Sequence, residues 1–314
     1  MPAFDKIVVV TQKTALEELV ERFNTREQAR FYLEHMGTPF ASYQSSHDAY
    51  IAALVELKRS MPAGVRSQFI ERSFLPNFLF GERDLVVALG RDGLVVNTAK
   101  YLSGQPLVAF NPDPQRNDGV LLPFQVPQAN AILAQTLEGN PTLRQVTMAK
   151  ASLNDGQVLY AVNDLFIGQR THTSARYRLQ HGKHSEDQSS SGIIVSTGAG
   201  STGWYRSILT GAASVVESLQ PRQGAYQVRD QYRFDWEANY LQYSVREPFI
   251  SRVSQARLAF GRIDTGEELI LTSQMPQNGV IFSDGIESDY LEFNSGRIAK
   301  IGVAEKKVNL VVAE

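Results

Sequence analysis

The spacing of apolar and polar residues changes near residue 120, and this change constrains the fold more than any single motif does. Before residue 120, apolar segments typical of buried strands, at residues 6–11, 84–89 and 106–110, alternate with segments whose apolar residues recur at helical spacing. Strands separated by helices favour a parallel sheet with right-handed crossovers. After residue 120, short alternating runs follow one another, as expected for antiparallel strands. The pattern therefore predicts an α/β + all-β chain, in which an N-terminal Rossmann-like α/β domain precedes a C-terminal domain of antiparallel strands, a β-sandwich or a barrel.

The predicted boundary between the two domains lies at residues 118 and 119. The α/β domain then covers residues 1–118 and the sandwich covers residues 119–314, with a C-terminal tail that can return to the first domain. We expect helices at residues 15–36, 47–60, 93–102, 127–137 and 202–219. In the sandwich we expect strands at residues 157–163, 175–180, 231–243, 268–274, 279–282 and 308–312. The polar stretch 181–191 is rich in serine, histidine and charge, which predicts a mobile loop.

Composition excludes several classes of function. The chain carries 31 basic and 33 acidic side chains, a net charge of -2, so no overall field favours nucleic acid or an anionic membrane. It has no cysteine, which excludes disulfides, cysteine-ligated zinc and a cysteine nucleophile. The first apolar run is too short for a signal peptide, and no apolar run is long enough to span a membrane. We therefore expect a cytoplasmic protein that binds neither nucleic acid nor a membrane.

The stretch 192–207 joins a strand of buried character to a helix through a turn of glycine, serine and threonine. The first amides of a helix are unpaired and lie at the positive end of its dipole, so such a turn suits the anionic parts of a nucleotide. Gly198, Gly200 and Gly203 fit the dinucleotide fingerprint G-x-G-x-x-G. However, no second strand ending in an acid follows about 20 residues later, as the fingerprint requires. A dehydrogenase is therefore the weaker hypothesis.

The same turn also resembles a nucleophile elbow centred on Ser201. Ala199 stands where that motif has its first glycine. All five histidines precede Ser201, whereas the elbow fold needs its histidine after the serine. A hydrolase of this type is therefore disfavoured, and the absence of a P-loop lysine motif also disfavours a Walker-type ATPase.

Two further motifs lie at strand ends. Residues 90–93 read Gly-Arg-Asp-Gly directly after the apolar strand 84–89. Asp92 is thus expected at the carboxyl edge of a parallel sheet, where open α/β sheets bind ligands. A carboxylate there can accept a proton from a hydroxyl group, and Arg91 can hold phosphate oxygens. The alternative is that Asp92 only caps the following helix.

The second motif is the pair Asn163-Asp164, which ends the apolar run 158–162. An amide next to a carboxylate can hold a ribose diol or the edge of a base. The alternative is a solvated turn, because Asn and Asp are frequent turn residues.

Taken in their order along the chain (residues 90–94, 163–164 and 196–204), the motifs resemble the NAD kinase family, within the ATP-NAD kinase and diacylglycerol kinase-like superfamily. Residues 90–94 read Gly-Arg-Asp-Gly-Leu where the family has GGDGT, and Asn163-Asp164 is similar to the family's Asn-Glu pair. Residues 196–204 are similar to its STPTGSTAY, and Asp284-Gly285 is similar to a later Asp-Gly. The stretch 110–116 resembles the divergent, mitochondrial-type branch. The similarity spans roughly residues 84–290.

The resemblance implies a reaction and a set of site residues. A phosphoryl group would move from ATP or polyphosphate to the adenosine-ribose 2′-hydroxyl of NAD and give NADP, with Asp92 taking the hydroxyl proton. Such a transfer depends on positioning and charge neutralisation, and Mg²⁺ would sit on the donor phosphates with few protein ligands, so no metal-binding residues are expected. The resemblance also implies small-molecule nucleotide partners and a homodimer or homotetramer. The implied nucleotide-binding residues are Gly90, Arg91, Gly93, Asn111, Asn163, Asp164, Ser201, Thr202, Trp204 and Ser207.

Several functional turns depart from the family pattern. Arg91 and Leu94 replace the second Gly and the Thr of GGDGT, and Ser191 stands where the family usually has an Asp that contacts NAD. These departures keep two other hypotheses open. One is a kinase of the same fold that acts on a sugar or lipid hydroxyl, and the other is a non-catalytic NAD(P)-binding protein.

Overall fold

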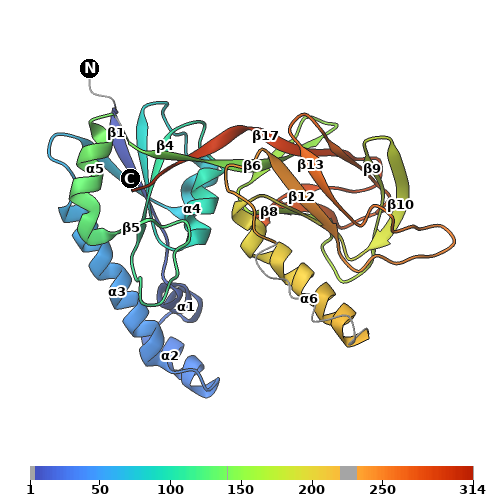
Figure 1. Cartoon of the computed structure of the whole chain (residues 1–314). Helices are drawn as coiled ribbons and strands as arrows, with labels where there is room; N and C mark the ends of the chain where they lie inside the picture. Colours follow the sequence, from blue (N-terminus) through green and yellow to red (C-terminus); the bar gives the residue numbers. More distant parts are fainter. Residues whose placement is uncertain (1–3, 140, 220–231, 314) are drawn as a thin grey trace. The chain divides into compact units, whose positions relative to one another are not determined.

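The computed structural model describes residues 4–139, 141–219 and 232–313, and the chain divides into two compact units (Figure 1). Unit 1 consists of Met1–Arg144 and Asn309–Glu314, and unit 2 of Gln145–Val308. This division falls later in the sequence than the expected boundary at residues 118 and 119. Residues 119–144 add a short strand and a helix that pack on the parallel sheet of unit 1, so they group with that unit. The α/β + all-β class is confirmed by the two sheets described below.

Unit 1 is built on a parallel sheet with the strand order β2-β1-β3-β4. Its strands β1 (Lys6–Thr11), β3 (Asp84–Leu89) and β4 (Pro106–Asn111) fall where the apolar runs predicted them. All six residues of β3 are buried, because a parallel strand is covered on both faces. The remaining strands are β2 (Arg66–Glu71) and β5 (Phe124–Gln125), while the end of β17 (Ile298–Val311) pairs with the start of β4.

Helices cover this sheet and share its core. Residues of α3 (Phe40–Arg59) and α5 (Ala129–Leu137) form one apolar cluster with side chains of β1, β3 and β4. The helix expected at residues 15–36 is in fact two helices, α1 (Ala15–Phe23) and α2 (Arg26–His35). The chain breaks between them because Asn24 adopts a left-handed conformation and the Thr25 hydroxyl caps α2. The other helices of unit 1 are η1 (Arg72–Asn77), α4 (Asp92–Ala99) and η2 (Val126–Gln128).

Unit 2 is a sandwich of two sheets whose inner faces share one large apolar cluster. In the first sheet, the strands β9 (Ala175–His181), β10 (His184–Ser190) and β14 (Leu269–Ser273) lead to β17, β6 (Leu143–Leu153) and β7 (Val158–Ala161). The second sheet has the order β13-β12-β11-β8-β15-β16, and every pair in it is antiparallel. These strands are β8 (Asp164–Gln169), β11 (Ile193–Ser196), β12 (Tyr240–Val245), β13 (Phe260–Asp264), β15 (Gly279–Ser283) and β16 (Ile286–Glu292).

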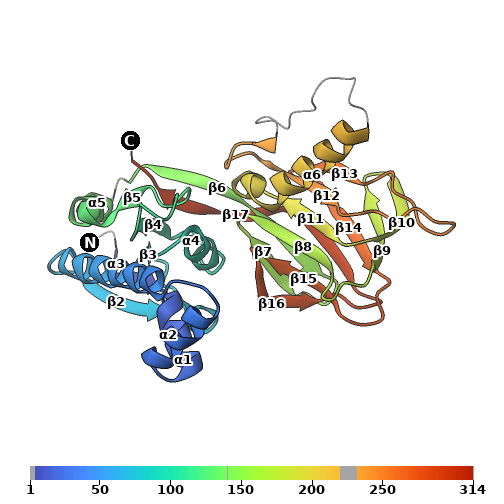
Figure 2. The ribbon, with the colours of Figure 1, turned by 90° about the horizontal axis from the view of Figure 1, so that it is seen from below.

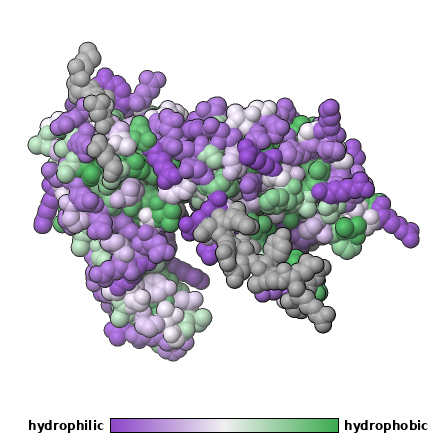
Figure 3. Space-filling model, viewed as in Figure 1, coloured by the Kyte–Doolittle hydropathy of each residue, from purple (hydrophilic) through white to green (hydrophobic). Residues whose placement is uncertain are grey.

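The long helix α6 (Trp204–Leu219) follows β11 through the short turn η3 (Ala199–Thr202). It lies along the second sheet (Figure 2). Trp204 and Ile208 pack there on a small cluster of the buried residues Phe166, Ile194 and Val280. None of the described helices combines the length and apolarity needed to cross a membrane. The face drawn in Figure 3 is mostly hydrophilic.

The prediction of a mobile loop at residues 181–191 is wrong. Most of this stretch is strand β10, which pairs residue by residue with β9 from His184 to Ser190. Its polar side chains alternate, and Glu186, Gln188 and Ser190 are buried. Glu186 accepts the Leu258 amide at 2.9 Å, so the polar residues that suggested a loop are in part internal hydrogen-bonding groups. The strand expected at residues 231–243 begins at Tyr240, and residue 231 lies outside the described residues.

Candidate functional site

The Asp turn of unit 1 lies at the carboxyl end of β3, as the sequence predicts. Asp92 is the first residue of α4, and Arg91 is its N-cap residue without a side-chain cap. The Asp92 carboxylate is half-buried and accepts the Leu121 amide at 2.6 Å. Asp92 is therefore not a simple cap of its own helix, because its carboxylate also holds the loop that follows β4.

The two glycines of this turn, Gly90 and Gly93, have different structural roles. A Cβ atom at Gly90 would lie 2.7 Å from the Leu94 Cδ2 atom, so this glycine allows β3 and α4 to pack closely. A Cβ atom at Gly93 would meet nothing within 4 Å, and Arg91 beside it is exposed. Within this first turn the Leu94 amide donates to the Arg91 carbonyl at 2.8 Å, and the positive end of the α4 dipole beside the exposed Arg91 favours an anion.

Asn111, at the end of β4, is buried and serves its own loop. Its Oδ1 atom accepts the Asp113 amide at 3.0 Å, and its Nδ2 atom donates to the Asn117 carbonyl at 3.0 Å. Asp113 forms an ion pair with Arg116 at 2.7 Å. Both hydrogen-bonding ends of the Asn111 amide are thus used within the loop, so this side chain shapes the edge of the sheet next to Asp92.

In unit 2, the glycine-rich turn after β11 is packed against its own unit. A Cβ atom at Gly198 would lie 1.9 Å from the Asp235 carbonyl oxygen, and one at Gly200 would lie 2.0 Å from the Asn163 carbonyl oxygen. The amides of Gly200, Ser201 and Gly203 donate within the turn, at 3.2, 3.3 and 2.9 Å. The expectation that this turn offers free amides to a nucleotide is therefore wrong for these three positions, because the turn uses them to hold its own shape.

Thr197 joins this turn to the Asn-Asp motif. Its hydroxyl lies within hydrogen-bonding distance of the Val162 and Asn163 carbonyls, and it accepts the Gly200 amide at 3.2 Å. Its amide also donates to the Asn163 carbonyl, at 2.9 Å. Segments that lie more than 30 residues apart in the sequence are thereby held side by side. Thr197 was not among the predicted site residues, although the Ser-Thr pair before the glycines was the available signal.

Asp284 organises the same region from the turn between β15 and β16. Its carboxylate accepts three consecutive backbone amides, from Val162 at 3.2 Å, from Asn163 at 2.7 Å and from Asp164 at 3.3 Å. Asp284 has a φ of 57° and Gly285 a φ of 72°, so the turn needs residues that tolerate the left-handed region. The predicted Asp-Gly motif therefore acts as a clamp that fixes the path of the chain at the Asn-Asp pair.

Asp164 is a buried carboxyl group within this clamp, with 8% of its surface exposed. Burial, and then the negative charge of Asp284, raise the pKa of Asp164 to about 7. Near neutral pH the group thus exchanges between an acid that donates a hydrogen bond and a carboxylate that accepts one. Asn163 beside it is half-buried. The solvated turn considered for this pair does not exist, because Asp164 begins the buried strand β8.

The remaining predicted residues lie in η3 and at the start of α6. Ser201 is buried, and its hydroxyl donates to the Gly198 carbonyl at 2.7 Å, so it stabilises the turn. Thr202 is half-buried and Ser207 is exposed. The Trp204 ring stacks on Phe166, with centroids 5.6 Å apart and planes 5° apart, and the Arg246 guanidinium lies 5.0 Å from its centroid.

The structure thus gathers the predicted residues into one cluster in each unit. Unit 1 brings together Gly90, Arg91, Asp92, Gly93 and the Asn111 loop. Unit 2 brings together Asn163, Asp164, Thr197 and Asp284, with the start of α6 following the same turn. Within the described ranges, no group of three or more His, Asp or Glu side chains is arranged to hold a metal ion.

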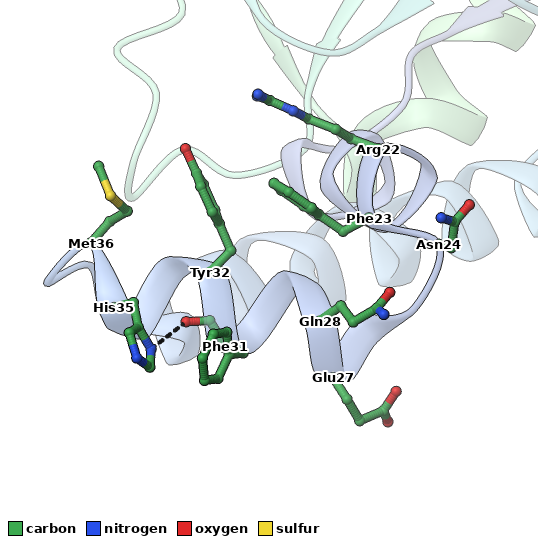
Figure 4. Close-up of a pocket in the computed structure, with 9 residues that line it drawn as sticks. All are labelled: Arg22, Phe23, Asn24, Glu27, Gln28, Phe31, Tyr32, His35 and Met36. Carbon is green, nitrogen blue, oxygen red and sulfur yellow. Dashed lines mark hydrogen bonds between the residues drawn. The ribbon is translucent and has the colours of Figure 1, made fainter.

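A separate hollow of about 670 Å³ lies on α1 and α2 (Figure 4). Phe31 and Met36 on its wall are exposed, and the Phe23 and Tyr32 rings contact one another with centroids 4.5 Å apart. None of the predicted site residues lines this hollow.

The known proteins that this chain is similar to are NAD and NADH kinases, at low sequence identity. No protein-family profile matches the chain. The chain is 24% identical to a probable NADH kinase of Oryza sativa subsp. japonica over 64% of its own length, and it spans only 63% of that protein's length. It is 23% identical to NAD kinase 2, mitochondrial, of Rattus norvegicus, covering 98% of this chain and 88% of the rat protein. It is 30% identical to an NAD kinase of Acidithiobacillus ferrooxidans, covering 48% of this chain and 56% of that one.

Solved structures share the fold. Yeast NADH kinase, crystallised with NADH, matches with a TM-score of 0.59 at 13% identity, covering 100% of this chain and 84% of that one. An NAD kinase from Archaeoglobus fulgidus, in complex with ATP, matches with a TM-score of 0.57 at 14% identity, covering 98% of this chain and 94% of that one.

Proposed function

We propose that this chain, which belongs to the NAD kinase superfamily, transfers a phosphoryl group from ATP to the adenosine-ribose 2′-hydroxyl of NAD and so forms NADP. The observation that carries the proposal is the position of Asp92. It stands half-buried at the first residue of α4, directly after a fully buried parallel strand, with an open glycine and an exposed arginine beside it.

In unit 1, Asp92 is proposed to accept the proton of the attacking hydroxyl group. Its bond to the Leu121 amide holds the carboxylate in one orientation before substrate binds, which is the kind of positioning that phosphoryl transfer needs. Gly90 lets α4 start close to the sheet, and Arg91 and Gly93 face the phosphate oxygens. Asn111 contributes by fixing the neighbouring loop.

In unit 2, the clamped Asn163-Asp164 pair is proposed to hold the ribose and base of NAD. Because the pKa of Asp164 is raised to about 7, this side chain can donate to a ribose oxygen or accept from a ribose hydroxyl. Thr202, Trp204 and Ser207 are proposed to complete the nucleotide site from the start of α6. Ser201 supports them through its bond within the turn.

Several finer points belong to the same proposal. Mg²⁺ is expected on the donor phosphates, which supply most of its ligands. Polyphosphate is the alternative donor. The protein is proposed to act in the cytoplasm as a homodimer or homotetramer, with nucleotides as its small-molecule partners. The α/β domain is proposed to supply the Asp turn, and the sandwich domain the NAD site.

The test is an assay of the purified protein with NAD, ATP and MgCl₂, in which NADP is measured by enzymatic cycling. NADH and polyphosphate serve as further arms for the acceptor and the donor. We expect NADP formation, and we expect Asp92→Asn to reduce kcat by about 10²–10⁴-fold, since a positioned base contributes a factor of this size. Asp118→Asn, at an exposed position in the loop after β4, is the matched control and should keep the wild-type rate.

The Asn side chain retains an oxygen that can accept the Leu121 amide, so Asp92→Asn should keep the wild-type melting temperature. A wild-type rate in a well-folded Asp92→Asn protein would remove Asp92 from the reaction.

A second function is favoured by the exposed Arg91 and the buried Leu94, which replace residues of the family turn. With these side chains, the chain would be a kinase that acts on a sugar or lipid hydroxyl. A screen of acceptors for ATP consumption separates the two functions, and turnover with NAD alone would exclude the second. Binding of NAD without turnover under any donor would instead identify a non-catalytic NAD(P)-binding protein.

A further inference from the structure

The loop between β4 and β5 holds the Asp92 carboxylate, because the Leu121 amide in this loop donates to Asp92 at 2.6 Å. Arg116 lies in the same loop and has no task in the reaction as proposed above. We propose that Arg116 is a positioning residue for Asp92, because it ties this loop to helix α3. The inference rests on the proposed function, in which Asp92 accepts a proton during phosphoryl transfer, and Arg116 acts without touching the reacting groups.

The guanidinium group of Arg116 makes two contacts in different parts of the chain. Its Nη1 atom donates to the Asp113 carboxylate at 2.7 Å, and its Nη2 atom donates to the Ser45 hydroxyl on α3 at 3.0 Å. Asp113 is 9% exposed and belongs to the loop itself, while Ser45 is 71 residues away in the sequence. The planar fork of an arginine can hold two partners at once, whereas a lysine ammonium lacks this fixed geometry. Arg116 thus joins the loop to the helix.

Helix α3 is itself fixed to the strand end that precedes Asp92. The Tyr50 hydroxyl on α3 accepts the Gln12 amide at 3.0 Å and donates to the Leu89 carbonyl, at the end of β3, at 3.2 Å. Tyr50 and Leu57 are buried and belong to the apolar cluster that α3 shares with β1 and β3. A contact with α3 therefore fixes the loop relative to the Asp turn.

The contacts inside this loop transmit the position of Arg116 to Leu121. The Asn111 Nδ2 atom donates to the carbonyl of Asn117, the residue after Arg116, at 3.0 Å. A Cβ atom at Gly119 would lie 2.6 Å from the same Nδ2 atom, so the loop packs closely on Asn111. Leu121 follows in this packed segment and is buried. Without Arg116 these contacts remain, but the loop loses its tie to α3, and the Leu121 amide can shift against its carboxylate acceptor.

The position of Asp92 matters more to the rate than Arg116 matters to stability. A misplacement of about 1 Å at a reacting group can slow an enzyme by about 10²-fold. The Arg116 side chain is 45% exposed, and an exposed ion pair contributes little to folding. Loss of Arg116 should therefore lower the rate of phosphoryl transfer in a protein that stays folded.

The first test measures NADP formation by Arg116→Met, which keeps a long side chain and removes both contacts. We expect kcat to fall about tenfold and the KM values for NAD and ATP to stay unchanged, because Arg116 acts on the base and not on binding. Arg116→Lys, which keeps the charge, should restore part of the rate. Ser45→Ala removes the same tie from α3, where alanine favours the helix, and should also lower kcat. Arg66→Met, at an exposed position of β2, is the control and should keep the wild-type rate.

A double-mutant cycle separates positioning from a general loss of structure. If Arg116 acts through Asp92, Arg116→Met should not slow the Asp92→Asn protein any further, because the base is already absent. A substitution that only loosened the fold would lower the rate by the same factor in both backgrounds. An equal loss in the Asp92→Asn protein would therefore overturn the proposal, and so would a wild-type kcat in a folded Arg116→Met protein.

Hydrogen exchange tests the positioning without any turnover. In Arg116→Met, the Leu121 amide should exchange about tenfold faster than in the wild type, because its loop is no longer fixed against the acceptor. Arg66→Met should leave this exchange rate unchanged. Unchanged exchange at Leu121 in a folded Arg116→Met protein would also overturn the proposal. If the wild type forms no NADP but exchange at Leu121 responds to Arg116→Met, the proposed function fails, while Arg116 still sets the position of the Asp92 carboxylate.

Discussion

At the scale of single residues, the pair Asp164 and Asp284 sets the electrostatics of the candidate site in unit 2. The pKa of Asp164 is raised to about 7 by burial and by the charge of Asp284, against about 3.9 in an unfolded chain. The folded protein therefore binds this proton more tightly than the unfolded chain. The resulting stabilisation is complete below pH 4 and is lost as the pH rises through 7.

Because the wild-type protein loses stability as the pH rises through 7, Asp164→Asn should remove this loss. One unit of pKa shift corresponds to about 1.4 kcal/mol. The effect of the substitution on the free energy of unfolding should therefore be more favourable at pH 8 than at pH 4, by up to about 4 kcal/mol. Urea unfolding of both proteins at pH 4 and pH 8 measures the difference. Asp118→Asn, at an exposed position, is the control. Parallel stability profiles for wild type and Asp164→Asn would contradict the raised pKa.

Asp284 leads to a second prediction at this scale. Asp284→Ala leaves three backbone amides without their carboxylate and places alanine at a φ of 57°, so it should cost about 2–4 kcal/mol of folding free energy. Asp284→Asn keeps an oxygen acceptor and tolerates this φ, so its cost should be about half. If the clamp positions Asn163 and Asp164 for NAD, the KM for NAD should rise more than kcat falls. Equal stability of the two variants would show that the clamp contributes little.

At the scale of elements, the turn between β11 and α6 shows why its glycines are there. A Cβ atom at Gly200 would lie 2.0 Å from the Asn163 carbonyl oxygen, whereas one at Gly203 would come no closer than 3.4 Å to any atom. Gly200→Ala should therefore destabilise the protein by more than about 3 kcal/mol or prevent folding, and Gly203→Ala should cost about 1 kcal/mol or less. Thermal and urea unfolding of this matched pair tests the packing. Similar losses at both positions would mean that the backbone relaxes around the new methyl group.

Elements with a strong period were predictable from the sequence, and those shaped by tertiary contacts were not. The strands β1 and β3 lie where continuous apolar runs placed them, because buried parallel strands carry apolar residues on both faces. Strand β10 was missed, because its inward residue Glu186 meets backbone amides that are distant in sequence. The same reason hid the functions of Thr197 and Asp284, whose partners lie about 35 and 120 residues away. Asp92 was found because a strand end and a glycine turn are local signals.

At the scale of the whole molecule, the placement of the tryptophans allows nucleotide binding to be followed in unit 2 alone. Both tryptophans, Trp204 and Trp236, belong to unit 2, so tryptophan fluorescence reports the unfolding of that unit alone. Circular dichroism, in contrast, includes the helices α1 to α5 of unit 1. A protein with two units need not unfold in a single step, so the two signals can have different midpoints.

If unit 2 holds NAD, a saturating NAD concentration should raise the fluorescence-detected midpoint. At one hundred times Kd, mass action adds about 2.7 kcal/mol to the stability of the state that binds. Asp92→Asn should keep this shift while it loses NADP formation, because the proposed task of Asp92 in unit 1 is proton transfer and not NAD binding. Trp236→Phe is the control for the reporter, since the shift must persist when Trp204 alone is observed. A shift seen by circular dichroism but absent from the fluorescence would place NAD on unit 1, and the assignment of Asn163 and Asp164 would then be wrong.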